Sequence, residues 1–345
     1  MPNLGLVEPV SKQLNAPQRT LNGRHFGSVG KQRLRRLQAP NVMDVRLDLH
    51  YPRAMTKTAQ GHLAMLLFSF LVAGSFALGG MIANLIDPVA LTALRFLIAS
   101  CLLSTLIALS GKFERAHLKA PWRYVLLGAS MALYFVMMFI GLKSASPVST
   151  SAVFTLTPIM SALFGWILLR QVTTPWMALA LSVGATGALW VIFKADLSAF
   201  LAFDIGRGEA LFFIGCVGHA IYAPLVPKLN RGEPTVVFTA GMLIAGTVIL
   251  GIFGAPKILA TDWLNLPPLV YLCVAYLSLV TTAFTFFLVQ YSAMRLPASK
   301  VMAYTYLTPS FVILWEGVLG NGLPMLKVGF GALLTALALV MLLRD

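Results

Sequence analysis

The chain has 345 residues, of which 58% are hydrophobic and only 11% are charged. Soluble domains hold about 25% charged residues, and a soluble protein this apolar would expose large patches that drive aggregation. The formal net charge of +14 comes from basic residues in the N-terminal stretch and in short loops, not from one folded basic face, so we exclude nucleic acid as a partner. The composition predicts an all-α integral membrane protein whose surroundings are the lipid bilayer.

Residues 1–60 show no hydrophobic period and hold ten Lys or Arg side chains against three acids, Glu8, Asp44 and Asp48. A segment of this kind cannot bury enough apolar surface to fold, so we predict a disordered basic tail. An Arg-rich transit peptide is one alternative, against which the two aspartates count. Translation from Met43 or Met55 is another, and we expect residues 1–54 to be dispensable.

Ten apolar segments follow the tail, each close to the roughly 20 residues that a spanning helix needs. Long uninterrupted runs favour helices over the short alternating strands of a barrel. We expect residues 61–194 and 195–345 to form two repeats of five helices each. The segments are 62–82, 88–109, 122–142, 147–169, 175–193, 208–227, 235–254, 268–290, 298–319 and 325–343.

The distribution of basic residues between the loops predicts the orientation of the chain. If the N-terminus is cytoplasmic, the inside loops hold ten Lys or Arg residues and the outside loops hold five, before the tail is counted. Cytoplasmic loops carry the excess of Lys and Arg. We therefore expect a multi-pass protein of the inner (plasma) membrane with both termini in the cytoplasm.

Two short patterns recur about 150 residues apart. Leu156-Thr-Pro158 and Leu307-Thr-Pro309 each lie in the fourth segment of their half, and Asp87-Pro88 and Glu233-Pro234 each open the second. An acid and a proline at these places are typical of a helix start. Since five spans is an odd number, the second half must enter the membrane inverted, as in secondary transporters.

Three stretches are similar to the EamA family of the drug/metabolite transporter superfamily. They are Asp87-Pro-Val-Ala-Leu-Thr-Ala-Leu-Arg95-Phe96, Gly141-Leu-Lys-Ser-Ala-Ser146 with the later Leu-Thr-Pro158, and Tyr291-Ser-Ala-Met-Arg-Leu-Pro-Ala-Ser299 with Leu-Thr-Pro309. The resemblance covers about residues 62–343 and implies a transporter. The chain departs from the family at Arg170-Gln171 and Gly320-Asn321, where the family usually has an acid, so no role of those acids is carried over.

Three ionisable residues fall inside apolar segments: Arg95, His219 and Glu316. Such residues are costly in hydrocarbon and are candidates for function. At a rise of 1.5 Å per residue, Arg95 and Glu316 would lie roughly 10 Å and roughly 6 Å from the same membrane face. We predict that they pair, either to fix helix packing or as a substrate carboxylate or proton site. His219 is expected to form a helix–helix hydrogen bond or to carry a proton.

The other candidates for a substrate cavity lie on the same or adjacent segments. Pro158 and Pro309 would each free a backbone carbonyl and bend a helix, as a packing kink or as a hinge beside the cavity. Gly184 and Gly187 predict a close helix–helix approach. The remaining candidates carry a hydroxyl or an aromatic ring, and they are Tyr134, Thr155, Tyr222, Tyr304, Tyr306 and Trp315.

Catalytic and nucleotide-binding motifs do not occur in the sequence, and the separated cysteines Cys101, Cys216 and Cys273 lack metal-ligand spacing. We therefore predict neither enzyme activity nor a cofactor nor a metal. The expected function is a secondary active transporter, exporter or importer, of a small metabolite or drug-like molecule by alternating access. Protons and a second copy of the chain are candidate partners. An organellar sugar-phosphate-type exchanger and a membrane-embedded enzyme or lipid-handling protein remain as alternatives.

Overall fold

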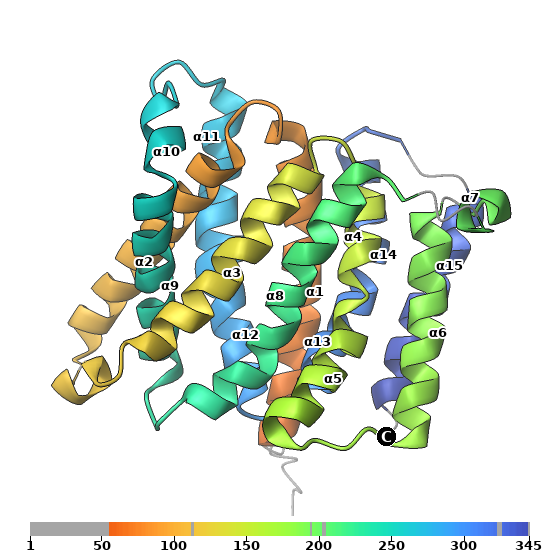
Figure 1. The fold of residues 1–345 in the computed structure, drawn as a ribbon, viewed down its shortest axis with the longest axis horizontal. Coiled ribbons are helices and arrows are strands. Elements are labelled where there is room, and N and C mark those ends of the chain that lie inside the picture. The colour runs from red at the N-terminus through yellow and green to blue at the C-terminus, as the bar shows by residue number, and fades with distance from the viewer. Residues whose placement is uncertain (1–54, 112–113, 194, 202–204, 323–325, 344–345) are drawn as a thin grey trace, which may run out of the picture. The chain divides into compact units, whose positions relative to one another are not determined.

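The computed structural model describes residues 55–111, 114–193, 195–201, 205–322 and 326–343, and these residues form helices without a strand (Figure 1). Of the predicted tail, residues 1–60, residues 1–54 lie outside the described residues, and the prediction of disorder is wrong for Lys57–Gln60, which form the first turn of the first helix. The helices are α1 Lys57–Ile82, α2 Pro88–Ser110, η1 Arg115–Leu118, α3 Trp122–Gly141, α4 Pro147–Phe154, α5 Thr157–Leu169, α6 Pro175–Ile192, α7 Leu197–Leu201, α8 Arg207–Leu229, α9 Thr235–Phe253, α10 Ala255–Ala260, α11 Pro268–Ala275, the π-helical η2 Tyr276–Phe284, α12 Thr285–Ala293, α13 Ala298–Ala303, η3 Tyr304–Leu307, α14 Thr308–Val318 and α15 Leu326–Leu343.

Nine helical stretches in the described part of the chain are long and apolar enough to cross a membrane. Two of them join several elements: Pro147–Leu169 runs through α4 and α5, and Pro268–Ala293 runs through α11, η2 and α12. Large apolar side chains such as Leu109 and Phe253 are more than three-quarters exposed, which suits contact with lipid tails and not with water. The chain is a multi-pass membrane protein.

The starts of two helices show how local sequence positions the bundle. The Asp87 carboxylate accepts the backbone N–H groups of Val89 and Ala90 at the start of α2, with Pro88 in the first turn, as the sequence predicts. Glu233-Pro234 also marks a helix start as predicted, since α9 begins at Thr235, but the proline is not in the first turn and the Glu233 side chain does not cap the helix. Pro234 is the N-cap of α9 and no side chain caps it, because the Glu233 carboxylate is bound elsewhere, as described below.

Each Leu-Thr-Pro sequence marks a break between helices. Pro158 lies in the first turn of α5, and Pro309 in the first turn of α14, where proline fits without the loss of a helical hydrogen bond. The two breaks meet, since the hydroxyls of Thr157 and Thr305 lie 3.2 Å apart. Around this contact α5 packs against α13, and α4 packs against α14 (Figure 1).

Small residues allow the closest helix contacts, as predicted for Gly184 and Gly187. A Cβ on Gly187 would lie 2.7 Å from the Gly331 carbonyl oxygen, where α6 packs on α15. A Cβ on Gly184 would overlap the Tyr306 ring. In hydrocarbon, such close backbone approach supplies the packing that holds helices together.

The contact between α3 and α9 gives a test of this packing. A Cβ at Gly128 would lie 2.6 Å from the Gly246 nitrogen and 2.7 Å from the Met242 oxygen, and backbone atoms cannot turn aside. We expect Gly128→Ala to destabilise the protein by about 1–3 kcal/mol through overpacking, seen as a lower melting temperature in detergent. The matched control is Gly251→Ala on α9, where nothing lies within 4 Å of the added Cβ. Equal melting temperatures for the two variants would refute this account.

Candidate functional site

The deepest charge in the described part of the bundle is Arg95 on α2, whose side chain is 0% exposed. Its Nε and Nη2 groups donate to the Thr282 hydroxyl at 3.2 Å and 3.0 Å, and Nη2 also donates to the Thr281 hydroxyl at 3.1 Å. These bonds cross from the first half of the chain to the second. They hold one edge of the guanidinium against η2.

The π-helical geometry of η2 explains how two successive threonines bind one guanidinium. The Thr281 hydroxyl donates to the Leu277 carbonyl, four residues back, and the Thr282 hydroxyl donates to the same carbonyl from five residues away. Both hydroxyl protons are therefore used within the helix, and both oxygens are left to accept from Arg95. Short π-helical stretches inside α-helices are frequent at functional sites.

Arg95 does not pair with Glu316, so that prediction is wrong. The ion pairs between described residues are Arg123–Glu233 and Lys257–Asp87, and the Glu316 carboxylate instead accepts a hydrogen bond from the Asn321 amide at 3.2 Å. The guanidinium carbon of Arg95 lies 4.2 Å from the centre of the Phe135 ring and 5.2 Å from that of Phe139. Aromatic faces stabilise a desolvated cation in this position.

Five ring-bearing side chains next to Arg95 contact one another in a closed circuit that joins both halves of the chain. Tyr134 and Phe135 on α3, Phe286 on α12, and Tyr222 and His219 on α8 form it. The ring centres are 4.7 Å apart for Tyr134–Phe135, 5.6 Å for Phe135–Phe286 and 6.3 Å for Phe286–Tyr222. They are 6.3 Å apart for Tyr222–His219 and 4.6 Å for His219–Tyr134. We call these five residues the aromatic circuit.

Three polar atoms at this circuit are buried and lack a hydrogen-bond partner among the described residues. They are Nη1 of Arg95, the hydroxyl of Tyr134 and Nδ1 of His219. The expected helix–helix hydrogen bond of His219 is therefore not made through Nδ1, and its ring lies against Tyr134 and Phe154. Buried polar groups are nearly always paired, so a cluster of unpaired ones is a candidate place for a polar ligand.

Tyr222 is held by a hydrogen-bond chain that the sequence analysis missed. The Gln290 amide donates to the Tyr222 hydroxyl at 2.8 Å, and its carbonyl accepts from the Thr239 hydroxyl at 2.9 Å. All three side chains are buried. A glutamine and two adjacent threonines, Thr281 and Thr282, inside one apolar segment were the available signals.

The other candidate residues lie elsewhere in the bundle, where most of their polar groups are occupied. The Tyr304 hydroxyl bonds His62 at 3.1 Å, and the Thr155 hydroxyl donates to the Ala152 carbonyl at 2.6 Å. The Tyr306 hydroxyl donates to the Leu181 carbonyl at 3.4 Å. Trp315 is half-buried and packs against Phe70 and Tyr276, and its indole N–H has no partner among the described residues. The structure thus brings together Arg95, Tyr134, His219 and Tyr222, and it separates these from the rest.

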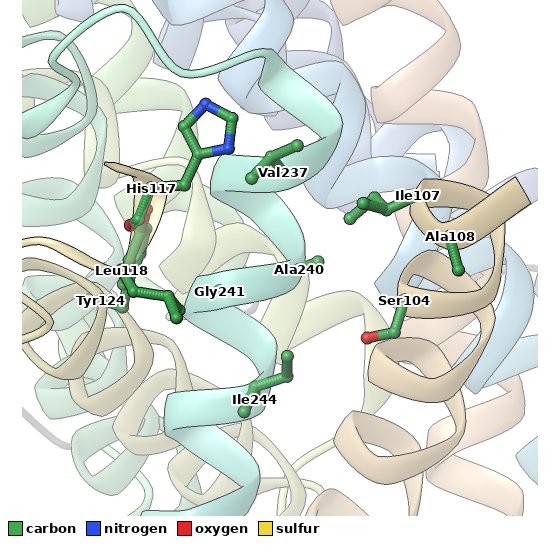
Figure 2. Close-up of a pocket in the computed structure, with 10 residues that line it drawn as sticks. All are labelled: Ser104, Ile107, Ala108, His117, Leu118, Tyr124, Val237, Ala240, Gly241 and Ile244. Carbon is green, nitrogen blue, oxygen red and sulfur yellow. The ribbon is translucent and has the colours of Figure 1, made fainter. Parts of the chain in front are cut away.

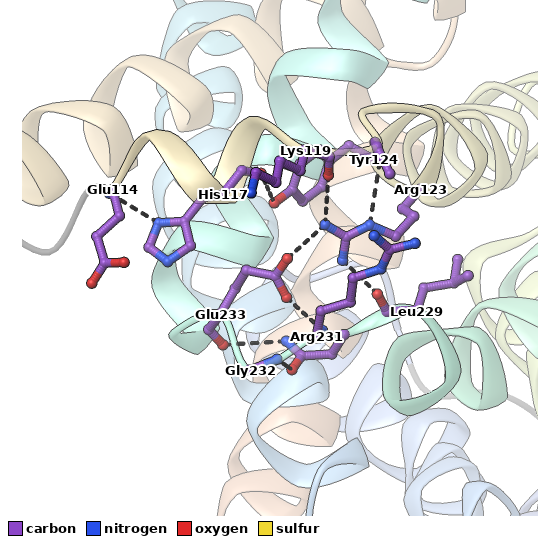
Figure 3. Close-up of polar contacts among 11 residues, drawn as sticks. Glu114, His117, Lys119, Arg123, Tyr124, Leu229, Arg231, Gly232 and Glu233 are labelled. Carbon is purple, nitrogen blue, oxygen red and sulfur yellow. Dashed lines mark hydrogen bonds and ion pairs between the residues drawn. The ribbon is translucent and has the colours of Figure 1, made fainter. Parts of the chain in front are cut away.

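A second buried charge cluster closes one end of the bundle, where α3 begins (Figure 3). The Arg123 guanidinium donates to the Glu233 carboxylate at 2.6 Å and to the Leu229 carbonyl, the last residue of α8, at 2.6 Å. The carboxylate also accepts the Arg231 backbone N–H at 2.6 Å. Both charged side chains are almost fully buried. Arg123 thus ties α3 to the α8–α9 connection.

An apolar groove of about 310 Å³ lies beside this cluster, between the end of α2 and the start of α9 (Figure 2). Ile107, Val237 and Ile244 are among the side chains that line it, with Ser104 and Tyr124 as the hydroxyl-bearing ones. The groove does not include Arg95 or the aromatic circuit. The side chains that line the groove are mostly apolar, so the groove suits a lipid tail better than a polar ligand.

Comparisons with known proteins agree with this fold. The EamA-like transporter family matches residues 59–193 and 206–344, and the chain belongs to that family, which is part of the drug/metabolite transporter superfamily. It is 22% identical over 284 residues to "Uncharacterized transporter YyaM" of Bacillus subtilis (strain 168), covering 81% of this chain and 92% of the relative. It is 24% identical to an "Uncharacterized transporter" of Archaeoglobus fulgidus, covering 79% and 94%. A solved structure described as "Crystal structure of protein" has the same fold, with a TM-score of 0.63, 21% identity and coverage of 83% of this chain and 96% of that one.

The Arg123–Glu233 pair predicts how stability depends on pH. Burial alone raises the pKa of the Glu233 carboxyl, but the hydrogen bonds donated by Arg123 and by the Arg231 backbone outweigh it and bring the pKa below its ordinary value. A lowered folded-state pKa means that the stabilisation is present above the ordinary pKa and is lost as the pH falls through the folded-state value. Removal of one partner of a buried pair costs about 3–5 kcal/mol.

We therefore expect Glu233→Gln to lower the melting temperature in detergent at about pH 7. Between about pH 7 and about pH 4, the melting temperature of this variant should fall less than that of the wild type. The matched control is Asp262→Asn, an exposed acid whose partner is the neighbouring Asn265. Glu233→Gln with the melting temperature and acid dependence of the wild type would show that the pair contributes nothing measurable.

Proposed function

We propose that the protein is a secondary active transporter that carries a small molecule between the two sides of a membrane by alternating access. The observation that carries the proposal is the group of unpaired buried polar atoms on Arg95, Tyr134 and His219. This group lies where helices of the two family repeats meet. In transporters built from two repeats, substrate binds near the middle of the membrane at the interface of the repeats.

The proposal includes a tenth span, formed by α13, η3 and α14 over Ala298–Val318. None of these three elements is long enough alone to span a bilayer. Together they span 21 residues, close to the 23 of Pro147–Leu169, and their Leu-Thr-Pro break has the same place in the second repeat as that of α4 and α5 in the first. Helices interrupted at the level of the site are typical of secondary transporters.

Inverted symmetry is supported by the way the helices pair. The counterparts in the two repeats are α1 and α8, α2 and α9, α3 and the α11–η2–α12 stretch, and α6 and α15. If each element is exchanged for its counterpart, the contact of α3 with α8 becomes that of α1 with α12. The contact of α3 with α9 becomes that of α2 with η2, and the pairs α2–α9 and α6–α15 map onto themselves. All of these contacts are present. Such exchange is what a two-fold axis between the repeats would produce.

Transport is proposed to be driven by a gradient, with protons as the candidate coupling ion and His219 as a candidate proton carrier. The test is uptake of a labelled metabolite panel by vesicles that contain the full chain, with and without a proton gradient. We expect saturable flux of at least one solute above that of empty vesicles, and a fall of about tenfold or more for His219→Gln at unchanged folded yield.

The control in this assay is Tyr271→Phe, because Tyr271 is exposed and its hydroxyl bonds only the Trp263 carbonyl. This variant should transport at the wild-type rate. A folded protein that moves no member of a broad panel faster than empty vesicles would count against the transport function. Wild-type flux for His219→Gln would remove His219 from the site.

We propose that the protein lies in the inner (plasma) membrane with both termini in the cytoplasm. Reporter fusions in the 110–121 loop should then read as cytoplasmic, and fusions in the 194–207 loop as external. The opposite pattern at both loops would reverse the orientation and leave the fold unchanged.

A further inference from the structure

We propose that the substrate is a small organic monoanion, a carboxylate on an apolar or aromatic body, and that Arg95 and Tyr134 bind its carboxylate. The inference rests on the proposed transport function and adds the substrate class. Arg95 has only neutral hydrogen-bond partners, its Nη1 has no partner among the described residues, and the side chains around it are largely aromatic.

The guanidinium of Arg95 is a permanent cation, because arginine is not deprotonated in proteins. Its hydrogen-bond partners are the hydroxyls of Thr281 and Thr282 and the Thr281 carbonyl. These groups orient the guanidinium but bring no negative charge. A buried charge normally has a counter-charge.

The acids inside described helices do not supply that counter-charge. Glu209 on α8 accepts from the Ser149 hydroxyl at 2.7 Å. Glu316 on α14 accepts from Asn321 through Oε2, and its Oε1 is buried without a partner among the described residues. Neither forms an ion pair with Arg95, since the described ion pairs involve Arg123 and Lys257. An anion from outside the chain would therefore complete the site.

Two unpaired donors belong to residues that both contact the Phe135 ring. The Arg95 guanidinium stands 4.2 Å from the centre of that ring, and the centre of the Tyr134 ring stands 4.7 Å from it. Nη1 of Arg95 and the Tyr134 hydroxyl both lack a partner. A carboxylate has two oxygens and can accept from both a guanidinium edge and a hydroxyl.

The other residues around Arg95 favour a substrate with a single charge and an apolar body. Arg95 is the single Lys or Arg among the described residues that lies deep inside a span, because Arg123, Arg207 and the others lie at helix ends or in loops. One cation matches a monoanion better than a phosphate dianion. Phe76, Phe154 and Phe212 contact one another, and the last two also contact Tyr134, which suits an apolar body.

Arg95 is fully buried in this arrangement, so a substrate must enter through a different conformation of the protein. This is consistent with a transporter that closes around its site.

The test uses the purified full chain and a panel of monocarboxylates, including benzoate, phenylacetate, indole-3-acetate and hexanoate, each compared with its neutral amide. Affinity is read from the concentration dependence of the melting temperature, and transport from counterflow of the labelled acids in vesicles. We expect at least one acid, but not its amide, to stabilise the protein and to exchange across the membrane. Potassium chloride at the same ionic strength serves as the inorganic anion control.

Tyr134→Phe keeps the ring and removes only the hydroxyl, and it should weaken binding of that acid by about tenfold or more, because a hydrogen bond to a charged group is lost. Arg95→Gln should abolish the preference for acid over amide, and Tyr271→Phe should leave it unchanged. If Arg95→Gln does not fold, Tyr134→Phe decides alone.

The proposal is overturned if acids and amides act alike across the panel, or if folded Tyr134→Phe binds the acid as tightly as the wild type. It is also overturned if chloride alone gives the whole effect, which would make the site a halide site. Flux of neutral solutes without any acid would reject the substrate class and keep the transporter. Acid binding without flux would keep the anion site and reject the transport function.

Discussion

The arrangement of the core depends on one requirement, that a protonated guanidinium inside a membrane span must find oxygen atoms to bind. Arg95 finds them on η2, where a π-helical turn directs the hydroxyls of Thr281 and Thr282 to the same side. In a regular α-helix, neighbouring residues do not face the same partner. The local change of helix type, the contact of α2 with η2 and the position of Phe135 over the guanidinium together provide the surroundings of this one charge.

The sequence predicted where helices begin and break better than it predicted which side of each helix faces which neighbour. Apolar length, the Asp87 cap and the repeated Leu-Thr-Pro each depend on neighbours along the chain, and the structure shows a helix start or a break at each of these places. The pairing of Arg95 with Glu316 failed because depth along a helix says nothing about rotation around it. The face of Arg95 is directed to η2 and α3, and that of Glu316 to Asn321.

The roles of Arg123 and Glu233 could not be read from sequence for a related reason. Each is a charged residue next to a helix start, which by itself indicates a hydrated interface. Only the tertiary contact of α3 with the α8–α9 connection buries both side chains and brings them to 2.6 Å. Similarly, the Thr281–Thr282 pair is an ordinary feature of an apolar helix until α2 places a guanidinium beside it.

The two buried arginines differ in the kind of partner they have, and the difference matches what each must do. Arg123 has a carboxylate, two short hydrogen bonds and a helix end to hold, and such a pair is costly to separate. Arg95 has neutral hydroxyls, which orient the guanidinium without cancelling its charge. A carboxylate from the protein at that place would neutralise Arg95 and compete with an anionic substrate. Hydroxyl partners leave the charge available, and their individual bonds are weak enough to be exchanged when the two halves of a transporter move. The proposed anion would supply the counter-charge that Arg95 does not receive from the described helices.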